Sequence, residues 1–208
     1  MPEGRVTGQT EGEQPHQAEA PRLGDGDPPP FRALAATGRD QRGLIGGMQV
    51  DYQIVTRDLA QQSIILIRDR HRQSELPAFL GWAFGDLFSH LKVLGVEPAG
   101  PPFVIYHAFG PDDIDAEVCV PVSQPVTASG RSESRVLPAM TVARTLHVGP
   151  YEALGSAYAA VNDWTAIHGF EAAGPMQERY LNGPGEAASP ADYRTEIEIP
   201  IVRAALPV

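Results

Sequence analysis

The spacing of apolar and polar positions predicts the same kind of element at two places in the chain. Aliphatic and β-branched residues dominate 63–68 and, in alternation with polar residues, 140–146. This composition over six or seven residues is typical of a β-strand. We therefore expect one strand at the start of each half of the chain.

A helix is expected after each of these strands. In the first, Ser74 is a suitable N-cap, apolar residues recur at helical spacing, and Gly95 is placed to end the helix. In the second, Pro150 suits the first helical position, and Gly169 follows the last of the apolar residues that recur at helical spacing.

Two further strands follow each helix, at 103–109 and 115–122 in the first half and at 176–181 and 193–203 in the second. The unit is thus strand–helix–strand–strand, and it occurs twice. We expect an α+β fold in which two such units form an antiparallel sheet, with two helices on one face and a central ligand cavity.

An internal repeat supports this duplication. Residues 95–106 and 169–180 are identical at 6 of 12 positions without a gap, and each stretch ends in a tyrosine, Tyr106 or Tyr180. A strand that opens with a glutamate follows each one, at Glu117 and Glu196. An acidic residue at the start of an apolar strand, twice, suggests a cavity lined by carboxylates and aromatic rings.

The alternation of side chains within the last strand of each unit separates two faces. Ile197, Ile199 and Ile201 share one face, which should pack on the helices, whereas Glu196 points to the other. Glu117 likewise faces away from the valines of its strand. The pattern leaves two alternatives: the glutamates are solvated, or they are buried and need a partner.

The chain outside these units has a different composition. Residues 1–47 are rich in Pro, Gly, Gln, Glu and Asp, and we expect a disordered tail there. The folded domain is then 48–208, with repeat one at about 50–122, a polar linker at about 123–134, and repeat two at about 135–204.

Composition and charge exclude several functional classes. The net charge of −10 leaves no overall basic surface for nucleic acid, and we expect no direct nucleic-acid binding. There is no apolar run long enough for a membrane span and no signal peptide, so we expect a cytoplasmic protein. The single cysteine, Cys119, reads as a small buried side chain, and the six histidines lack zinc-like spacing. We expect neither a metal nor a cofactor, because no nucleotide-binding or hydrolase motif occurs.

Motifs along 50–204 together resemble the GyrI-like small-molecule-binding domain. In the second repeat they are His147-Val-Gly-Pro-Tyr151, Leu154, Ala157-Tyr158, Trp164, Gly174-Pro175, Tyr180-Leu-Asn-Gly-Pro184 and Thr195-Glu-Ile-Glu-Ile-Pro200. In the first they are Gly100-Pro-Pro-Phe-Val-Ile-Tyr106 and Glu117-Val-Cys-Val-Pro121. The family includes effector-binding domains of multidrug-sensing transcription activators, gyrase inhibitors and stand-alone proteins.

This resemblance implies a cavity between the two units for bulky aromatic ligands, often cationic. By motif, the family's carboxylate falls on Glu196 and its pocket tyrosine on Tyr180. Tyr106 and Glu117 follow only through the internal repeat. The further candidates for the cavity wall, each with plain core packing as its alternative, are Trp82, Trp164, Phe79 and Tyr158.

Three functions remain open. We rank first a stand-alone domain that binds bulky hydrophobic or cationic molecules, because we expect no DNA-binding segment. The second is a hydrolase of strained cyclopropane-containing compounds, with Glu196 as base and Tyr180 as hydrogen-bond donor. The third is a protein-binding inhibitor of the gyrase type, although nothing in the sequence points to a protein partner. Residue types alone do not distinguish binding from catalysis, nor do they fix the oligomeric state.

Overall fold

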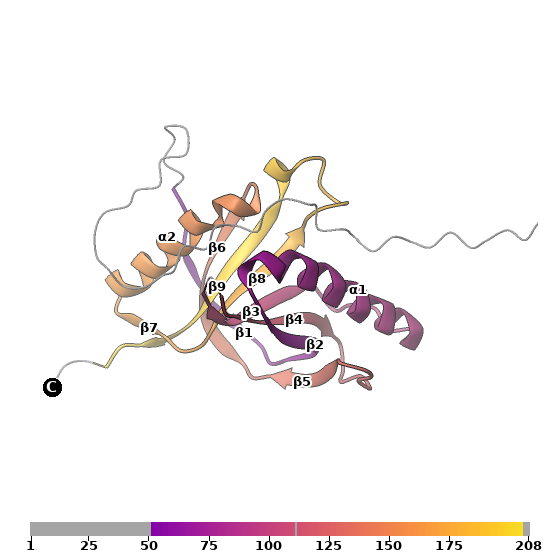
Figure 1. The fold of residues 1–208 in the computed structure, drawn as a ribbon. Coiled ribbons are helices and arrows are strands. Elements are labelled where there is room, and N and C mark those ends of the chain that lie inside the picture. The colour runs from indigo at the N-terminus through magenta and orange to yellow at the C-terminus, as the bar shows by residue number, and fades with distance from the viewer. Residues whose placement is uncertain (1–50, 111, 206–208) are drawn as a thin grey trace, which may run out of the picture.

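The computed structural model of the protein describes residues 51–110 and 112–205 (Figure 1). The expected tail, 1–47, lies outside the described residues. Nine strands and two α-helices form the described part of the chain. The α+β fold class expected from the sequence is therefore confirmed.

Eight strands form one continuous antiparallel sheet in the order β1-β6-β9-β8-β3-β4-β2-β5, and the short β7 pairs with β9. Their bounds are β1 Val55–Leu59, β2 Gln62–His71, β3 Phe103–Phe109, β4 Ile114–Val122, β5 Glu133–Leu137, β6 Met140–Val148, β7 Phe170–Ala172, β8 Met176–Asn182 and β9 Arg194–Arg203. The pair β8–β3 lies in the middle of this order, so it joins the two halves of the chain.

The two ends of the sheet are tied together by the chain itself. β1 pairs with β6 at one end and β5 pairs with β2 at the other, yet only residues 60–61 separate β1 from β2. Three steps of the chain span at most about 11 Å between Leu59 and Gln62, so the ends must approach each other. The sheet is consequently curled into a half-barrel.

The first helix, α1 (Leu76–Leu94), follows a 3₁₀ turn over Gln73–Glu75. Ser74 therefore lies within that turn rather than at the N-cap of α1. Gly95 ends the helix with φ of 67°, a left-handed conformation that an L side chain rarely adopts, as its place in the sequence predicts.

The second helix, α2 (Leu154–Ile167), also begins with a 3₁₀ turn, over Tyr151–Ala153. Pro150 precedes that turn in an extended conformation. His168 caps the helix and Gly169 follows with φ of 68°. Both helices thus end at the glycines that the sequence marks.

The two helices cover the same face of the sheet, and β8 and β9 run between them (Figure 1). α1 packs on β2 and β4, whereas α2 packs on β6, β7 and β9. Each helix closes its own apolar cluster, with Val118 and Val120 under α1 and Ile197 and Ile199 under α2. The face opposite the helices holds a third, smaller cluster that includes Phe103 and Cys119.

Three strands were not expected from the sequence: β1, β5 and β7. β1 and β5 are five-residue strands at the ends of the sheet and expose most of their side chains, so little hydrophobic alternation marks them. β7 has three residues. The start of β5 at Glu133 lies within the expected linker, so part of that segment is sheet.

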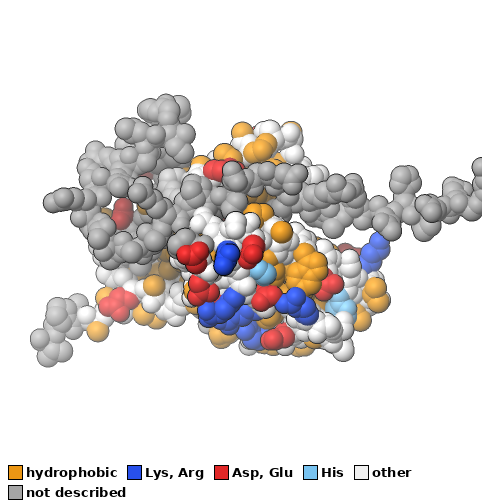
Figure 2. Space-filling view, in the orientation of Figure 1, with side chains coloured by type: hydrophobic (Ala, Val, Ile, Leu, Met, Phe, Trp, Pro, Cys, Tyr) orange, Lys and Arg blue, Asp and Glu red, His pale blue; other side chains and the backbone are white. Residues whose placement is uncertain are grey.

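Charged side chains of both signs lie next to one another on the face shown in Figure 2. Ion pairs among the described residues include Arg68 with Asp115 at 2.7 Å and Arg70 with Asp113 at 3.0 Å. No helix among the described residues is long and apolar enough to span a membrane.

Candidate functional site

A glutamate is buried where the two helix-covered halves meet. Alternation along β8 places Met176, Glu178 and Tyr180 on the face that the helices cover. Only 2% of Glu178 is exposed, and it lies directly opposite Val104 of β3. A carboxylate in this position has lost nearly all of its contact with water.

Three tyrosine hydroxyls donate hydrogen bonds to this carboxylate. Tyr158 of α2 reaches Oε1 at 2.6 Å, and Tyr180 reaches Oε2 at 2.7 Å. Tyr106 of β3 reaches Oε2 at 3.4 Å. The donors come from three elements, so the tertiary fold assembles the cluster that we call the Tyr–Glu178 cluster (Glu178, Tyr106, Tyr158 and Tyr180).

The carboxylate has no cationic partner within the described part of the chain, because none of the ion pairs found there includes Glu178. Burial raises the pKa of Glu178, and the hydrogen bonds from Tyr158, Tyr180 and Tyr106 offset part of that rise. The cluster is thus a hydrogen-bonded carboxylate without a compensating positive charge.

The tyrosines stay protonated in this environment. Burial, followed by the nearby Glu178, holds the pKa values of Tyr158 and Tyr180 well above their ordinary range, and Tyr106 behaves in the same way. All three can therefore act as O–H donors at any physiological pH.

A row of aromatic rings leads from this cluster toward the surface. Tyr180 packs edge-to-face against Phe84 of α1 and against Tyr151, with ring centroids 6.0 Å and 5.8 Å apart. Tyr151 in turn lies 5.0 Å from Tyr193. A Cβ at Gly183 would lie 2.8 Å from the hydroxyl of Tyr151, so the glycine makes room for this ring.

The glutamates that the sequence singled out lie on the other face of the sheet. Glu196 pairs with Arg144 at 2.7 Å, and its neighbour Glu198 pairs with Arg179 at 3.3 Å. Glu117 is fully buried and pairs with Arg135 and, at 3.1 Å, with His107. These carboxylates face away from the aliphatic layer, as the alternation predicts, but their charges are already balanced.

The other aromatic candidates are distributed over both helices. Phe79 and Trp82 of α1 contact each other, and Arg131 lies over the Trp82 ring at 5.1 Å. Trp164 of α2 stacks on His168 and Phe170. The structure thus brings Tyr106, Tyr158 and Tyr180 to Glu178, whereas the tryptophans have neighbours elsewhere.

Sequence reasoning missed Glu178. In the internal repeat the position aligned with it is Val104, so the duplication gives no hint of an acid there. The available signal was local: Glu178 stands two residues before Tyr180 and therefore shares its face of the strand.

The arrangement suits two kinds of chemistry. An ionised Glu178 with aromatic rings around it can hold a lipophilic cation, and a desolvated carboxylate beside hydroxyl donors can position water. No group of three or more potential ligands among the described residues could hold a metal ion.

Comparison with known families decides the classification of the chain. The GyrI-like small molecule binding domain matches residues 52–202. The chain belongs to the GyrI-like family. This GyrI-like domain therefore includes both the Tyr–Glu178 cluster and the ion pairs on the opposite face.

Solved structures share the fold. EcmrR in a DNA complex has a TM-score of 0.68 at 21% identity, and the match covers 74% of this chain and 58% of that one. The GyrI-like domain thus spans little more than half of EcmrR. A hydrolase from Listeria innocua has a TM-score of 0.55 at 12% identity, covering 72% of this chain and 92% of that one.

A third structure, SAV2435 bound to tetraphenylphosphonium, has a TM-score of 0.50 at 13% identity, covering 74% of this chain and 94% of that one. At these identities the similarities show the fold alone. No curated protein sequence matches the chain.

Proposed function

We propose that this GyrI-like domain binds a bulky, aromatic or lipophilic cation at the Tyr–Glu178 cluster. One observation carries the proposal: Glu178 is buried, and its hydrogen-bond donors within the described chain are tyrosine hydroxyls rather than basic groups. A bound cation would supply the missing positive charge.

The energetics favour such a ligand over an anion or a small polar molecule. A cation over a tyrosine face gains about 0.5–2 kcal/mol, and the carboxylate adds direct charge attraction in a site shielded from water. Aromatic walls bury apolar surface with few directional demands, so ligands of different shapes can be accepted.

Access to Glu178 requires a side chain to move, since the carboxylate is 2% exposed. Tyr180 is the natural candidate because it is partly exposed and lies at the edge of the cluster, where its ring packs edge-to-face against Phe84 and Tyr151. We propose that the ligand displaces this ring and takes its place beside the carboxylate.

The comparisons support binding of a small molecule, and the ligand of this chain is our proposal. The family is one of small-molecule-binding domains, and a protein of the same fold was solved with the lipophilic cation tetraphenylphosphonium.

Titration with tetraphenylphosphonium tests the proposal. We expect saturable binding, and Glu178→Gln should weaken it by at least about tenfold, because the neutral amide cannot balance the cation. The matched control is Glu196→Gln, on the opposite face of the sheet, which should leave the affinity within about twofold. Loss of binding in Glu196→Gln but not in Glu178→Gln would refute the assignment.

A hydrolase acting on strained cyclopropane-containing compounds is the second candidate. The raised pKa of Glu178 favours it, since a carboxylate with a higher pKa is a better base toward water. Here Glu178 takes the role of base that we expected for Glu196, and Tyr180 remains the donor to the substrate. Mass spectrometry of a reactive cyclopropanoid should show faster ring opening than in buffer, and Glu178→Gln should abolish the difference.

A further inference from the structure

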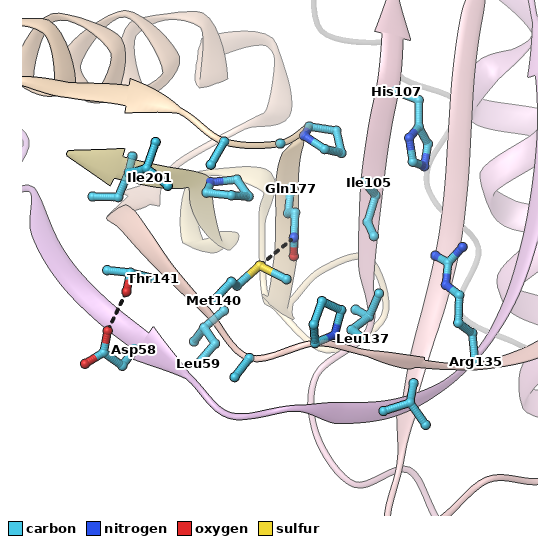
Figure 3. A pocket seen from close by; sticks show the side chains of 18 residues that line it. Asp58, Leu59, Ile105, His107, Arg135, Leu137, Met140, Thr141, Gln177 and Ile201 are labelled. Carbon is cyan, nitrogen blue, oxygen red and sulfur yellow. Dashed lines mark hydrogen bonds between the residues drawn. The ribbon is translucent and has the colours of Figure 1, made fainter. Parts of the chain in front are cut away.

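A pocket lies on the face of the sheet that the helices do not cover (Figure 3). Its volume is about 790 Å³, within the range of small-molecule sites. β3 and β8 form one wall, and the connection from β5 to β6 crosses opposite them. None of the residues of the Tyr–Glu178 cluster lines it.

The lining of this pocket is mostly apolar. Ile105 and Leu137 belong to the small apolar cluster of this face, and Pro138, Met140 and Pro200 continue the surface. Such a lining favours a molecule that buries hydrocarbon or aromatic surface.

Two donors at the pocket lack strong acceptors. The Nε of Arg135 is buried and has no hydrogen-bond partner among the described residues, while another nitrogen of this guanidinium binds Glu117. Gln177 is 3% exposed, and its amide nitrogen donates to the thioether of Met140 at 3.7 Å. The Nε of Arg135 is enclosed by protein, whereas the Gln177 amide has only the thioether, a weak acceptor. The Gln177 amide would therefore gain from an oxygen placed in the pocket.

The charge of the pocket indicates an uncharged ligand. Arg135 and His107 both line the pocket and both contact the buried Glu117, and the ion pair with Glu117 already neutralises Arg135. At the rim, Asp58 accepts a hydrogen bond from Thr141 at 2.7 Å (Figure 3). An added anion would lie near the carboxylate of Glu117, and an added cation would lie near Arg135.

We propose that this pocket is a second ligand site, which takes an uncharged, largely apolar molecule bearing a carbonyl-type oxygen. The oxygen accepts a hydrogen bond from the amide of Gln177, and the rest of the molecule covers the apolar wall. The proposal is independent of the proposed function, because it concerns the other face of the sheet and an uncharged ligand rather than a cation.

The two sites share strands but not side chains. Gln177 and Glu178 are neighbours in β8 and point to opposite faces, as do Ile105 and Tyr106 in β3. Substitutions can therefore affect one site at a time.

Nile red, an uncharged dye with a carbonyl oxygen, is the probe, and its fluorescence is titrated against the full chain. We expect saturable binding that Ala139→Trp weakens by at least about tenfold, because the ring fills the pocket from an exposed connection. Gln177→Leu, which keeps the size but removes the donor, should weaken binding by about three- to tenfold. Glu178→Gln should leave the affinity for Nile red unchanged.

Competition separates the two sites. Tetraphenylphosphonium should not displace Nile red from the wild-type chain, whatever its own affinity proves to be. The proposal is overturned if Nile red does not bind saturably, if tetraphenylphosphonium displaces it, or if Ala139→Trp and Gln177→Leu leave it unaffected. If circular dichroism shows that Ala139→Trp is unfolded, Ala173→Trp, at another residue that lines the pocket, takes its place.

Discussion

Buried carboxylates in this protein are stabilised in two different ways. Glu117 is balanced by Arg135, and Glu198 by Arg179. Glu178 has tyrosine hydroxyls instead, which stabilise its charge without cancelling it. At the scale of single residues, this difference is the reason that we propose Glu178, rather than Glu117 or Glu198, as the ligand-binding carboxylate.

The affinity for a lipophilic cation should depend on pH through Glu178. Because burial raises the pKa of this carboxyl above 4.5, the carboxyl is protonated, and the site neutral, at pH values where an ordinary glutamate is ionised. Binding of tetraphenylphosphonium should therefore strengthen as pH rises, and a titration series between about pH 5 and 8 measures this. Stability should change in the opposite sense, since ionisation of a buried group favours unfolding as pH rises.

Tyr158→Phe tests the cause of this dependence. The substitution removes the 2.6 Å hydrogen bond that lowers the pKa of Glu178, so the midpoint for cation binding should move to higher pH. Tyr193→Phe is the matched control, because the Tyr193 ring packs against Tyr151 and its hydroxyl makes no hydrogen bond to Glu178 among those found in the described chain. An unchanged midpoint in Tyr158→Phe would show that its hydroxyl does not stabilise the ionised form.

At the scale of elements, glycines define where the helices end. Gly95 and Gly169 adopt left-handed conformations directly after α1 and after the cap of α2. These positions return the chain from each helix to the sheet, which places β3 and β8 next to each other in the middle of the molecule.

Two glycine substitutions, one within α1 and one directly after it, separate conformational strain from helix propensity. Gly95→Ala should lower the free energy of unfolding by about 1 kcal/mol, because the alanine must adopt φ of 67°. Gly81→Ala lies within α1, where an added Cβ meets nothing within 4 Å, and should raise it by up to about 1 kcal/mol. Denaturant unfolding measures both, and equal effects of the same sign would contradict the structural explanation.

At the scale of the whole molecule, the two halves of the chain complete each other. β1 of the first half pairs with β6 of the second, and β5 of the second half pairs with β2 of the first. The central β3–β8 pair adds a third junction, and Glu178 lies on it. The candidate site and the sheet therefore both depend on the presence of the two halves.

Separated halves should not fold independently. Fragment 51–123 leaves β1 without its partner strand and β3 with an unpaired edge, and fragment 124–208 does the same for β5 and β8. Neither fragment should therefore show cooperative unfolding by circular dichroism. Mixed at equal concentration, the fragments should recover the spectrum and melting behaviour of the whole domain. Cooperative unfolding of either fragment alone would show that one half is an autonomous domain.

The sequence alone determined the local structure of the larger elements. The apolar alternation of 115–122 and 193–203 and the glycines at the helix ends are local signals, so the strands, the two helices and the fold class follow from them. The same alternation correctly assigned Glu117 and Glu196 to the face away from the aliphatic layer. β1 and β5 were not predicted, because strands at the ends of the sheet expose most of their side chains and show little alternation of apolar and polar residues.

Which side chains meet depends on the tertiary fold. Tyr106, Tyr158 and Glu178 lie far apart in the chain, and their hydrogen bonds depend on the β3–β8 pairing and on the packing of α2. Likewise, whether Glu196 is balanced depends on Arg144 of the neighbouring strand β6, which its own sequence context does not reveal. A pattern along the chain fixes the face to which a residue points, whereas the electrostatic partner on that face comes from distant segments brought together by folding.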